Sequence, residues 1–224
     1  FLKKNIFNKY KKKEILDIDK DLIQSNLKKK IIAKKYASDF IDIGSLKSLK
    51  KSKNFIRNKD IRPSFFLDRD GVINEEKNYV HKKKDFLWRK NIFKAIKLLN
   101  DKGYQVFVIT NQAGIAKGIY SEKQFNKLNN WMLKEFNKNG SFIDQVYYCP
   151  FHPKAKIKKF RKKTNLRKPG NGMILKALKE WNISKSKSFL IGDSLSDLSA
   201  GKKTNISSYF VKKDIFRQII ELIT

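Results

Sequence analysis

Short apolar runs alternate with longer segments of helix-like apolar spacing from Ser64 to the end of this chain. A short apolar run bounded by turn-forming residues is typical of a buried strand, whereas apolar residues three and four positions apart indicate an amphipathic helix. The pattern predicts strands over residues 64–67, 105–110, 145–149, 188–191 and 208–211. It predicts helices over residues 92–99, 173–181, 196–203 and 215–223.

A further helix is predicted to begin after Ser121, because serine is a favoured N-cap residue. One face of this helix carries large apolar side chains at helical spacing, namely Phe125, Leu128, Trp131, Met132 and Phe136. Strands and helices therefore alternate along residues 64–224, which favours an α/β fold with a mostly parallel sheet covered by helices on both faces. In such folds the active site lies beyond the carboxyl ends of the strands.

Residues 1–62 have a different texture, because they are lysine-rich and irregular in their apolar spacing. The pattern indicates helices over 15–27 and 46–55. Residues 58–63 are interpreted as a linker that ends at Pro63, since proline is a frequent break point. No apolar segment follows Phe1, so we expect no signal peptide, and we expect the first residues to continue a longer polypeptide.

The charge is strongly positive, with 52 lysines and arginines against 21 acids and a formal net charge of +31. Such a balance suggests a nucleic-acid or acidic-membrane binder. However, arginine, which is suited to bidentate phosphate contacts, accounts for only seven of these cations. A general lysine bias with solvated faces explains this composition better, so we expect nucleic-acid binding to be nonspecific if it occurs.

Two other features of the composition exclude whole classes of protein. No apolar run approaches the length of a membrane-spanning helix, so no membrane span is expected. The single cysteine cannot form an intramolecular disulfide, which favours a reducing compartment and hence the cytoplasm.

Polar side chains follow the predicted strands where the strands end. Asp68 and Asp70 come after the first strand and point the same way, so they could act as nucleophile and acid/base or hold a hard cation. Thr110, Asn111 and Gln112 follow the second strand and suit a bound phosphate oxygen. Taken alone, each motif is equally compatible with a polar turn.

Two further motifs continue this series. Lys168 precedes a predicted helix and could neutralise a phosphate. Asp193 follows the 188–191 strand, with Asp197 four residues later, and these acids could complete a magnesium site. Alternatively, Asp193 or Ser194 could simply cap the next helix. The order of all four motifs is more specific than any one of them.

This order resembles the haloacid-dehalogenase-like (HAD) phosphohydrolases, which implies a HAD-like Rossmannoid three-layer sandwich. Within that superfamily, residues 64–224 resemble the D-glycero-D-manno-heptose 1,7-bisphosphate 7-phosphatases, which have a minimal cap, and the related histidinol-phosphate phosphatases. The segments that resemble them are FLDRDGVIN (66–74), YV (79–80), TNQAGIA (110–116), YYCP (147–150) and RKP (167–169).

The resemblance implies a role for each matching residue. Asp68 would be the nucleophile and Asp70 the acid/base, while Thr110, Asn111 and Lys168 would bind the phosphoryl group. Mg²⁺ would be held by Asp68, Asp70 (through its backbone carbonyl) and Asp193. The expected substrate contacts are Gln112, Arg167, Glu76, Lys77, Asn78 and Tyr79.

The sequence departs from this family in two places. Relatives often hold a zinc ion in a Cys-x-His and Cys-x-Cys loop, but Phe151, Thr164 and Leu166 replace three of those ligands here. Cys149 and His152 do not make a four-ligand site, so we predict no zinc. Ser194 occupies a position where relatives usually have lysine, which affects the expected substrate rather than the chemistry.

Residues 40–45 (FIDIGS), followed by a helix, resemble the C-terminal end of sugar nucleotidyltransferase domains. The resemblance implies that Asp42 could bind a metal in a fused upstream domain of which residues 1–57 are the tail. A basic extension without such a role is the alternative. The expected function is a Mg²⁺-dependent phosphatase of heptose 1,7-bisphosphate in surface-glycan synthesis, with histidinol phosphate as the alternative substrate and nucleic-acid binding as the alternative class of function.

Overall fold

The computed structural model describes residues 17, 20, 24, 43–59 and 61–224. Asp42 and the predicted helix over 15–27 lie largely outside these residues. Among the described residues, no helix combines the length and apolar character that crossing a membrane requires.

Helix α1, Leu46–Lys59, belongs to the N-terminal part of the chain. Its start is stabilised by Ser45, whose Oγ accepts a hydrogen bond from the backbone N–H of Ser48 at 3.1 Å. The helix extends past the predicted end at Phe55, so the first two residues of the predicted linker over 58–63 are helical. The predicted helix end at Phe55 was therefore four residues too early, because polar residues such as Asn58 and Lys59 do not by themselves end a helix.

A five-stranded parallel sheet forms the centre of residues 64–224, in the order β3-β2-β1-β4-β5. The strands are β1 (Ser64–Leu67), β2 (Gln105–Asn111), β3 (Gln145–Cys149), β4 (Phe189–Gly192) and β5 (Ser207–Phe210). All five predicted strands are confirmed to within a residue at each end. The strand order places β1, the source of Asp68, in the middle of the sheet.

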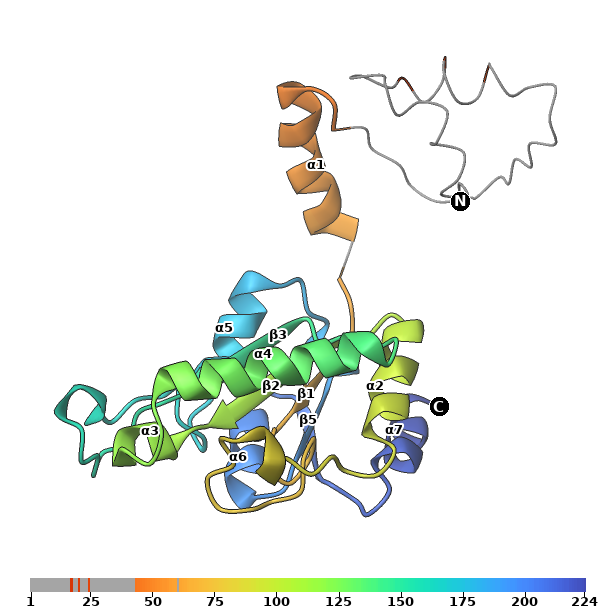
Figure 1. Ribbon diagram of the computed structural model, residues 1–224. Helices are drawn as coiled ribbons and strands as arrows, with labels where there is room; N and C mark the ends of the chain where they lie inside the picture. Colours follow the sequence, from red (N-terminus) through yellow and green to blue (C-terminus); the bar gives the residue numbers. More distant parts are fainter. Residues whose placement is uncertain (1–16, 18–19, 21–23, 25–42, 60) are drawn as a thin grey trace, which may run out of the picture. The chain divides into compact units, whose positions relative to one another are not determined.

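Helices cover both faces of this sheet (Figure 1). Phe65 and Leu67 of β1 point to one face, and Phe66 points to the other, because side chains alternate along a strand. The first face packs against helices α2 (Ile92–Asp101), α4 (Glu122–Lys138) and α7 (Ile215–Ile223). The second face packs against α5 (Gly172–Glu180) and α6 (Leu195–Lys202). This is the expected three-layer α/β sandwich.

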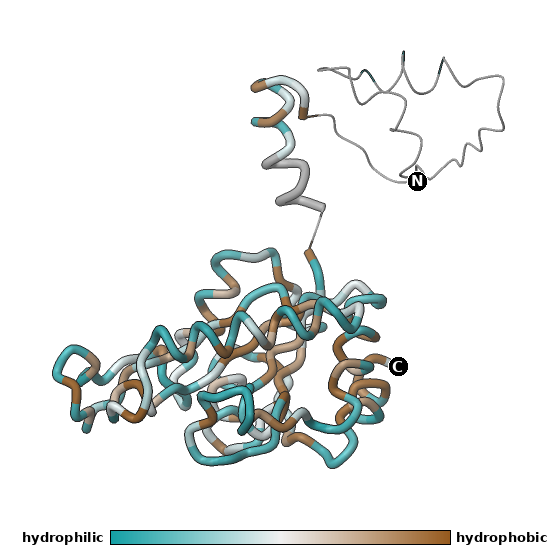
Figure 2. The backbone as a smooth tube through the Cα atoms, viewed as in Figure 1, coloured by the Kyte–Doolittle hydropathy of each residue, from teal (hydrophilic) through white to brown (hydrophobic). Residues whose placement is uncertain are grey.

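The predicted cap and apolar face of α4 are confirmed. Ser121 Oγ accepts from the backbone N–H of Gln124, and the Gln124 side chain accepts from the backbone N–H of Ser121. Four of the five predicted apolar residues are buried, and Trp131 is partly buried. Figure 2 shows the apolar strands at the centre of the 64–224 fold and polar segments around them.

Loops rather than a separate folded cap border the carboxyl ends of the strands in the described part of the chain. The loop between β1 and α2 contains a short 3-10 helix, Lys83–Asp85, and the loop between β3 and α5 contains another, Lys158–Phe160. A short helix, α3 (Ala113–Lys117), follows β2 directly. These segments surround the site described next.

Candidate active site

The carboxyl ends of β1, β2 and β4 meet around a polar cavity of about 290 Å³. Parallel strands place their carboxyl ends at one edge of the sheet, so residues far apart in the sequence converge there. The lining residues include Asp68, Asp70, Thr110, Lys168 and Asp193. The four sequence motifs at the strand ends therefore form one site.

Asp68 occupies the first position after β1 and lines the cavity at this edge of the sheet. Its Oδ1 accepts a hydrogen bond from the backbone N–H of Arg69 at 2.7 Å, and its Oδ2 lies 2.9 Å from Nζ of Lys168. Burial raises the pKa of the Asp68 carboxyl, Lys168 opposes that rise, and the nearby Asp197 and Asp70 add to it. The ammonium of Lys168 thus stabilises the carboxylate form that a nucleophile requires.

Lys168 is a buried cation held between two carboxylates. Besides Asp68, its Nζ lies 2.5 Å from Oδ1 of Asp197 and donates to the backbone carbonyl of Ile109 at 2.9 Å. Burial alone would lower the pKa of Lys168, but the two carboxylates raise it above its ordinary value. The side chain therefore stays a fixed positive charge at the end of the sheet.

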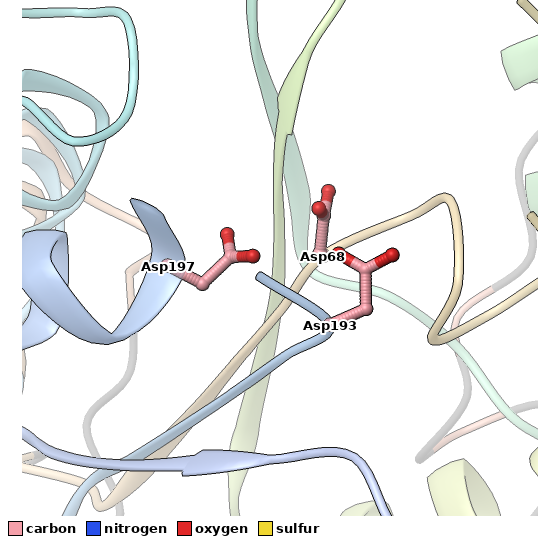
Figure 3. A group of neighbouring side chains, drawn as sticks. All are labelled: Asp68, Asp193 and Asp197. Carbon is pink, nitrogen blue, oxygen red and sulfur yellow. The ribbon is translucent and has the colours of Figure 1, made fainter. Parts of the chain in front are cut away.

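Three carboxyl groups, from Asp68, Asp193 and Asp197, form an acidic cluster whose nearest oxygens lie within 4.8 Å of one another (Figure 3). Asp193 approaches the Asp70-Gly71 turn so closely that a Cβ on Gly71, which has φ of +80°, would lie 2.2 Å from Asp193 Oδ2. Glycine is required there for both reasons. Oxygen donors of this kind suit a hard cation such as Mg²⁺.

The members of this acidic cluster are not equivalent. Both carboxyl oxygens of Asp197 are engaged, because Oδ1 faces Lys168 and Oδ2 accepts from the Ser194 hydroxyl at 2.6 Å and the Ser194 backbone N–H at 3.1 Å. Asp193 is exposed toward the cavity. The arrangement therefore leaves Asp68 and Asp193 as the carboxylates available to a cation, with Asp197 fixing Lys168 and the start of α6.

Asp70 is held from several sides by hydrogen-bond donors. The buried guanidinium of Arg69 donates through Nη2 to Oδ1 and Oδ2 of Asp70, at 2.8 and 2.7 Å, and through Nε to Oδ1 at 3.1 Å. Asn74 Nδ2 adds a bond to Oδ1 at 3.0 Å, and Gln112 Nε2 one to Oδ2 at 3.2 Å. The second carboxylate of the Asp-x-Asp motif thus has a fixed orientation beside the first.

Comparison with known proteins places this geometry in a family. Residues 64–216 match the family described as polynucleotide kinase 3 phosphatase. The chain is 45% identical over 155 residues to D-glycero-beta-D-manno-heptose-1,7-bisphosphate 7-phosphatase of Rhodopseudomonas palustris, which covers 69% of this chain and 86% of the relative. It is 42% identical to D-glycero-alpha-D-manno-heptose-1,7-bisphosphate 7-phosphatase of Photorhabdus laumondii, covering 66% of this chain and 81% of the relative.

This chain belongs to the HAD-superfamily heptose 1,7-bisphosphate 7-phosphatases. Solved structures agree with its fold. A structure described as a HAD-like phosphatase from Mesorhizobium loti gives a TM-score of 0.66 at 28% identity, covering 73% of this chain and 86% of that one. The D,D-heptose 1,7-bisphosphate phosphatase of B. bronchiseptica, solved with magnesium and phosphate, gives a TM-score of 0.61 at 24% identity, covering 71% and 86%.

The three residues predicted after β2 have different positions in this phosphatase. Thr110 is buried and lines the cavity. Asn111 lines the cavity, but its amide binds the backbone of Lys168, accepting from the N–H and donating to the carbonyl, both at 3.0 Å. Gln112 is buried and its amide is engaged by protein partners. The geometry thus favours supporting functions for Asn111 and Gln112 over the direct phosphate and substrate contacts that the sequence suggested.

The predicted substrate residues lie mainly around the rim of the cavity. Glu76, Asn78, Tyr79 and Arg167 line it, whereas Lys77 is exposed and is not among the lining residues. Burial raises the pKa of the Glu76 carboxyl, and the nearby Asp70 and Asp193 raise it further. The rim also includes Lys117, whose Nζ contacts the Tyr79 hydroxyl and lies 5.0 Å from the centre of its ring.

The loop over 150–166, where relatives often bind zinc, is fastened by apolar packing in this phosphatase. Ala155 and Phe160 are buried in a cluster with Ile115 and Ala116 of α3 and Phe125 of α4. Backbone bonds from Ile157 N–H to the Ala116 carbonyl, 3.1 Å, and from His152 N–H to the Phe160 carbonyl, 3.1 Å, complete the attachment. Cys149 is a fully buried residue at the end of β3, as expected of a small strand residue. The absence of zinc stays a prediction.

Sequence reasoning did not single out Arg69, Asn74 or Tyr120. Arg69 lies between the two motif aspartates and is 1% exposed, which is unusual for an arginine and is explained by its ion pair with Asp70. Asn74 reaches the same network from the turn after β1, and Tyr120 reaches it from the short connection between α3 and α4. The arginine between the two aspartates of the motif could have predicted a buried ion pair with one of them. Nothing in the local sequence around Tyr120 predicted its hydrogen bond to Gln112.

Proposed function

We propose that this phosphatase removes the 7-phosphate of a D-glycero-D-manno-heptose 1,7-bisphosphate in a Mg²⁺-dependent, two-step reaction. The observation that carries the proposal is the convergence of Asp68, Asp70 and Lys168 in one polar cavity. The names of the most similar relatives supply the substrate, and both anomers occur among them.

In the first step, a carboxylate oxygen of Asp68 attacks phosphorus and the bond from phosphorus to the sugar oxygen breaks. Asp70 donates its proton to that leaving oxygen, and an aspartyl-phosphate remains on Asp68. Lys168 lies 2.9 Å from Asp68, close enough to neutralise charge on the transferring group. Thr110 lines the same cavity, and its hydroxyl would donate to a phosphoryl oxygen.

In the second step, water attacks the aspartyl-phosphate and the bond from phosphorus to the Asp68 oxygen breaks. Asp70, now a carboxylate, takes the proton from the attacking water and is ready for another turnover. Splitting hydrolysis in this way lets one carboxyl group serve first as acid and then as base. Its fixed position beside Asp68 supports both tasks.

The acidic cluster fits a hard cation, since oxygens from Asp68 and Asp193 are available on one side of the cavity. Asp68, Asp193 and the backbone carbonyl of Asp70 would hold Mg²⁺. When bound, the cation supplies neutralisation of negative charge as the phosphoryl group approaches the carboxylates. The negative charge of the carboxylates around Asp68 would then be neutralised by the cation and by the ammonium of Lys168.

A substrate with two phosphates needs a second cationic region, and the cavity rim supplies one. Nη1 of Arg167 is buried and has no hydrogen-bond partner among the described residues. Arg167, His152 and Lys168 also line an adjoining cavity of about 490 Å³ that includes Lys163. The distal phosphate would bind on this side, with Asn78 and Tyr79 facing the sugar from the opposite loop.

The decisive experiment is phosphate release in the presence of Mg²⁺ from heptose 1,7-bisphosphate (both anomers), histidinol phosphate and a 3′-phosphorylated oligonucleotide. The last is included because the matched family description names a polynucleotide 3 phosphatase. The full chain is compared with Asp68→Asn and with Asp101→Asn, an exposed surface control. We expect a clear preference for the heptose, abolished by Asp68→Asn and unchanged in the control.

Other outcomes assign the protein differently. Preference for histidinol phosphate would overturn the sugar assignment but keep the chemistry. Preference for the oligonucleotide would indicate that the basic surface binds the substrate. Phosphate release from the oligonucleotide should then fall steeply as the salt concentration rises. Release that does not depend on Asp68 would reject the mechanism.

The proposal includes a cytoplasmic location, which the single buried thiol and a sugar-phosphate substrate favour. A fused upstream nucleotidyltransferase remains a prediction from the resemblance of residues 40–45. Cell fractionation and the length of the natural polypeptide would test these two statements.

A further inference from the structure

Gln112 is a buried amide whose polar atoms are all engaged inside the protein. It is 1% exposed. Its Oε1 accepts from the Tyr120 hydroxyl at 2.5 Å, and its Nε2 donates to Thr110 Oγ1 at 2.8 Å and to Asp70 Oδ2 at 3.2 Å. One side chain thus connects Asp70, the proposed acid/base, with the Thr110 hydroxyl and with Tyr120, which also lines the cavity.

The orientation of this amide follows from its partners. Toward the carboxylate form of Asp70, which takes the proton from water in the second step, the amide has to present its NH₂ group, because an amide oxygen there would face a carboxylate oxygen. Oε1 then faces Tyr120, which has to donate its hydroxyl proton. Burial raises the pKa of Tyr120 to about 12, so that proton is present at neutral pH. Tyr120 therefore determines which end of the amide reaches Asp70.

The same amide also orients Thr110. Because Thr110 Oγ1 accepts from Gln112 Nε2, its hydroxyl hydrogen is available for a phosphoryl oxygen in the cavity. Asp70 receives its other donors from Arg69 and Asn74, which belong to the turn after β1. Gln112 directly follows β2, and its amide links Asp70, which follows β1, to Thr110 in the neighbouring strand β2 through hydrogen bonds.

The position of Tyr120 is itself fixed by close packing. Its ring is 5% exposed and stacks on His81, with ring centres 5.0 Å apart and an interplanar angle of 11°. Gly114 permits this approach, since a Cβ there would lie 2.1 Å from Cε1 of Tyr120. His81 belongs to the loop that borders the substrate side of the cavity, which continues from Tyr79.

We propose that Gln112 is a positioning residue that aligns Asp70 and Thr110 for catalysis, and that Tyr120 fixes the orientation of its amide. The inference rests on the proposed function, because it assigns Asp70 as the acid/base. It differs from a substrate-binding role for Gln112, which would leave polar atoms of the amide pointing into the cavity without protein partners.

The test compares two substrates whose leaving groups differ in their need for a proton. Heptose 1,7-bisphosphate releases an alkoxide, which requires the acid, whereas p-nitrophenyl phosphate releases a stable phenolate. We expect Gln112→Met and Tyr120→Phe to lower kcat for the heptose by at least about tenfold, since general acid catalysis contributes about 10²–10⁴-fold. The fall for the aryl phosphate should be several times smaller, and KM should change little.

Tyr148→Phe is the matched control. Tyr148 lies in the same aromatic region, but its hydroxyl donates to Glu122 at 3.1 Å and is not connected to Asp70. Tyr120→Phe keeps the ring and its packing, so it remains informative if Gln112→Met folds poorly. Circular dichroism and thermal unfolding of each variant show whether the fold is kept.

Two results would overturn the inference. A rise in KM with unchanged kcat would identify Gln112 as a substrate contact, and equal losses on both substrates would remove the link to Asp70. Failure of the proposed function is distinguishable, because it would appear as phosphate release that is kept when Asp68 alone is replaced, with Gln112 and Tyr120 unchanged.

Discussion

Nζ of Lys168 lies 2.5 Å from Oδ1 of Asp197, and both side chains are almost completely buried. The sequence suggested Asp197 as a possible magnesium ligand and left its role open. In the structure its two oxygens are engaged by Lys168 and Ser194. Asp197 is therefore best understood as the residue that fixes Lys168 beside Asp68.

Replacing Asp197 with alanine should destabilise the protein strongly, because it removes one partner of a buried ion pair. We expect the free energy of unfolding to fall by about 3 kcal/mol, measured by urea denaturation. Asp101→Ala removes the partner of Lys97 in an exposed ion pair, and it should change the free energy of unfolding by no more than about 0.5 kcal/mol. Similar effects of the two substitutions would contradict the structural role given to Asp197.

Asp193 should control the affinity for Mg²⁺. We expect Mg²⁺ at 100 times its Kd to stabilise the unmodified protein by about 2.7 kcal/mol, seen as a rise in Tm. Asp193→Asn should raise the Kd at least about tenfold, which removes about 1.4 kcal/mol of that stabilisation at the same concentration. Asp101→Asn is the control for a charge lost elsewhere, and an unchanged response in Asp193→Asn would exclude this aspartate as a ligand.

Phe160 should hold the loop over 150–166 against α3 and α4. The loop contains several lysines, so trypsin reports its opening directly. We expect Phe160→Ala to increase the rate of trypsin cleavage within the loop by about tenfold or more, since a buried phenylalanine contributes about 3 kcal/mol. Phe142→Ala, at a side chain 47% exposed, should leave the rate unchanged.

The same assay tests the prediction that zinc does not hold this loop. A strong zinc chelator should leave the cleavage rate and the Tm of the unmodified protein unchanged. Faster cleavage after chelation would show that a metal contributes to the loop despite the replaced ligands.

Cys149 should be unreactive in the folded protein. Its side chain is fully buried, and burial raises the pKa of its thiol, so the thiolate fraction at neutral pH is lower than for a free cysteine. Ellman's reagent should therefore detect no thiol in the native protein and one thiol per chain after denaturation in guanidinium. Rapid reaction in the native state would show that β3 opens at its carboxyl end.

Local signals in the amino-acid sequence were enough to predict the order of elements in residues 64–224 and which polar residues meet at the edge of the sheet. Apolar runs and helix spacing are such signals, and parallel strands bring their carboxyl ends together. The positions of Asp68, Thr110 and Asp193 along the chain therefore sufficed to assign them to one edge of a sheet. The same signals placed the end of α1 too early, since the polar residues over 57–59 do not distinguish helix from linker.

The functions of the polar side chains depended instead on tertiary contacts. Whether an amide faces substrate or protein depends on its neighbours from other parts of the fold. The Asn111 amide binds the backbone of Lys168, and the Gln112 amide binds Asp70 and Tyr120. Burying Arg69 requires a partner, and its neighbour Asp70 became that partner only because the turn after β1 folds the two side chains together. Residue types and spacing determined which groups meet at the sheet edge, and three-dimensional packing determined which of their atoms remain available for chemistry.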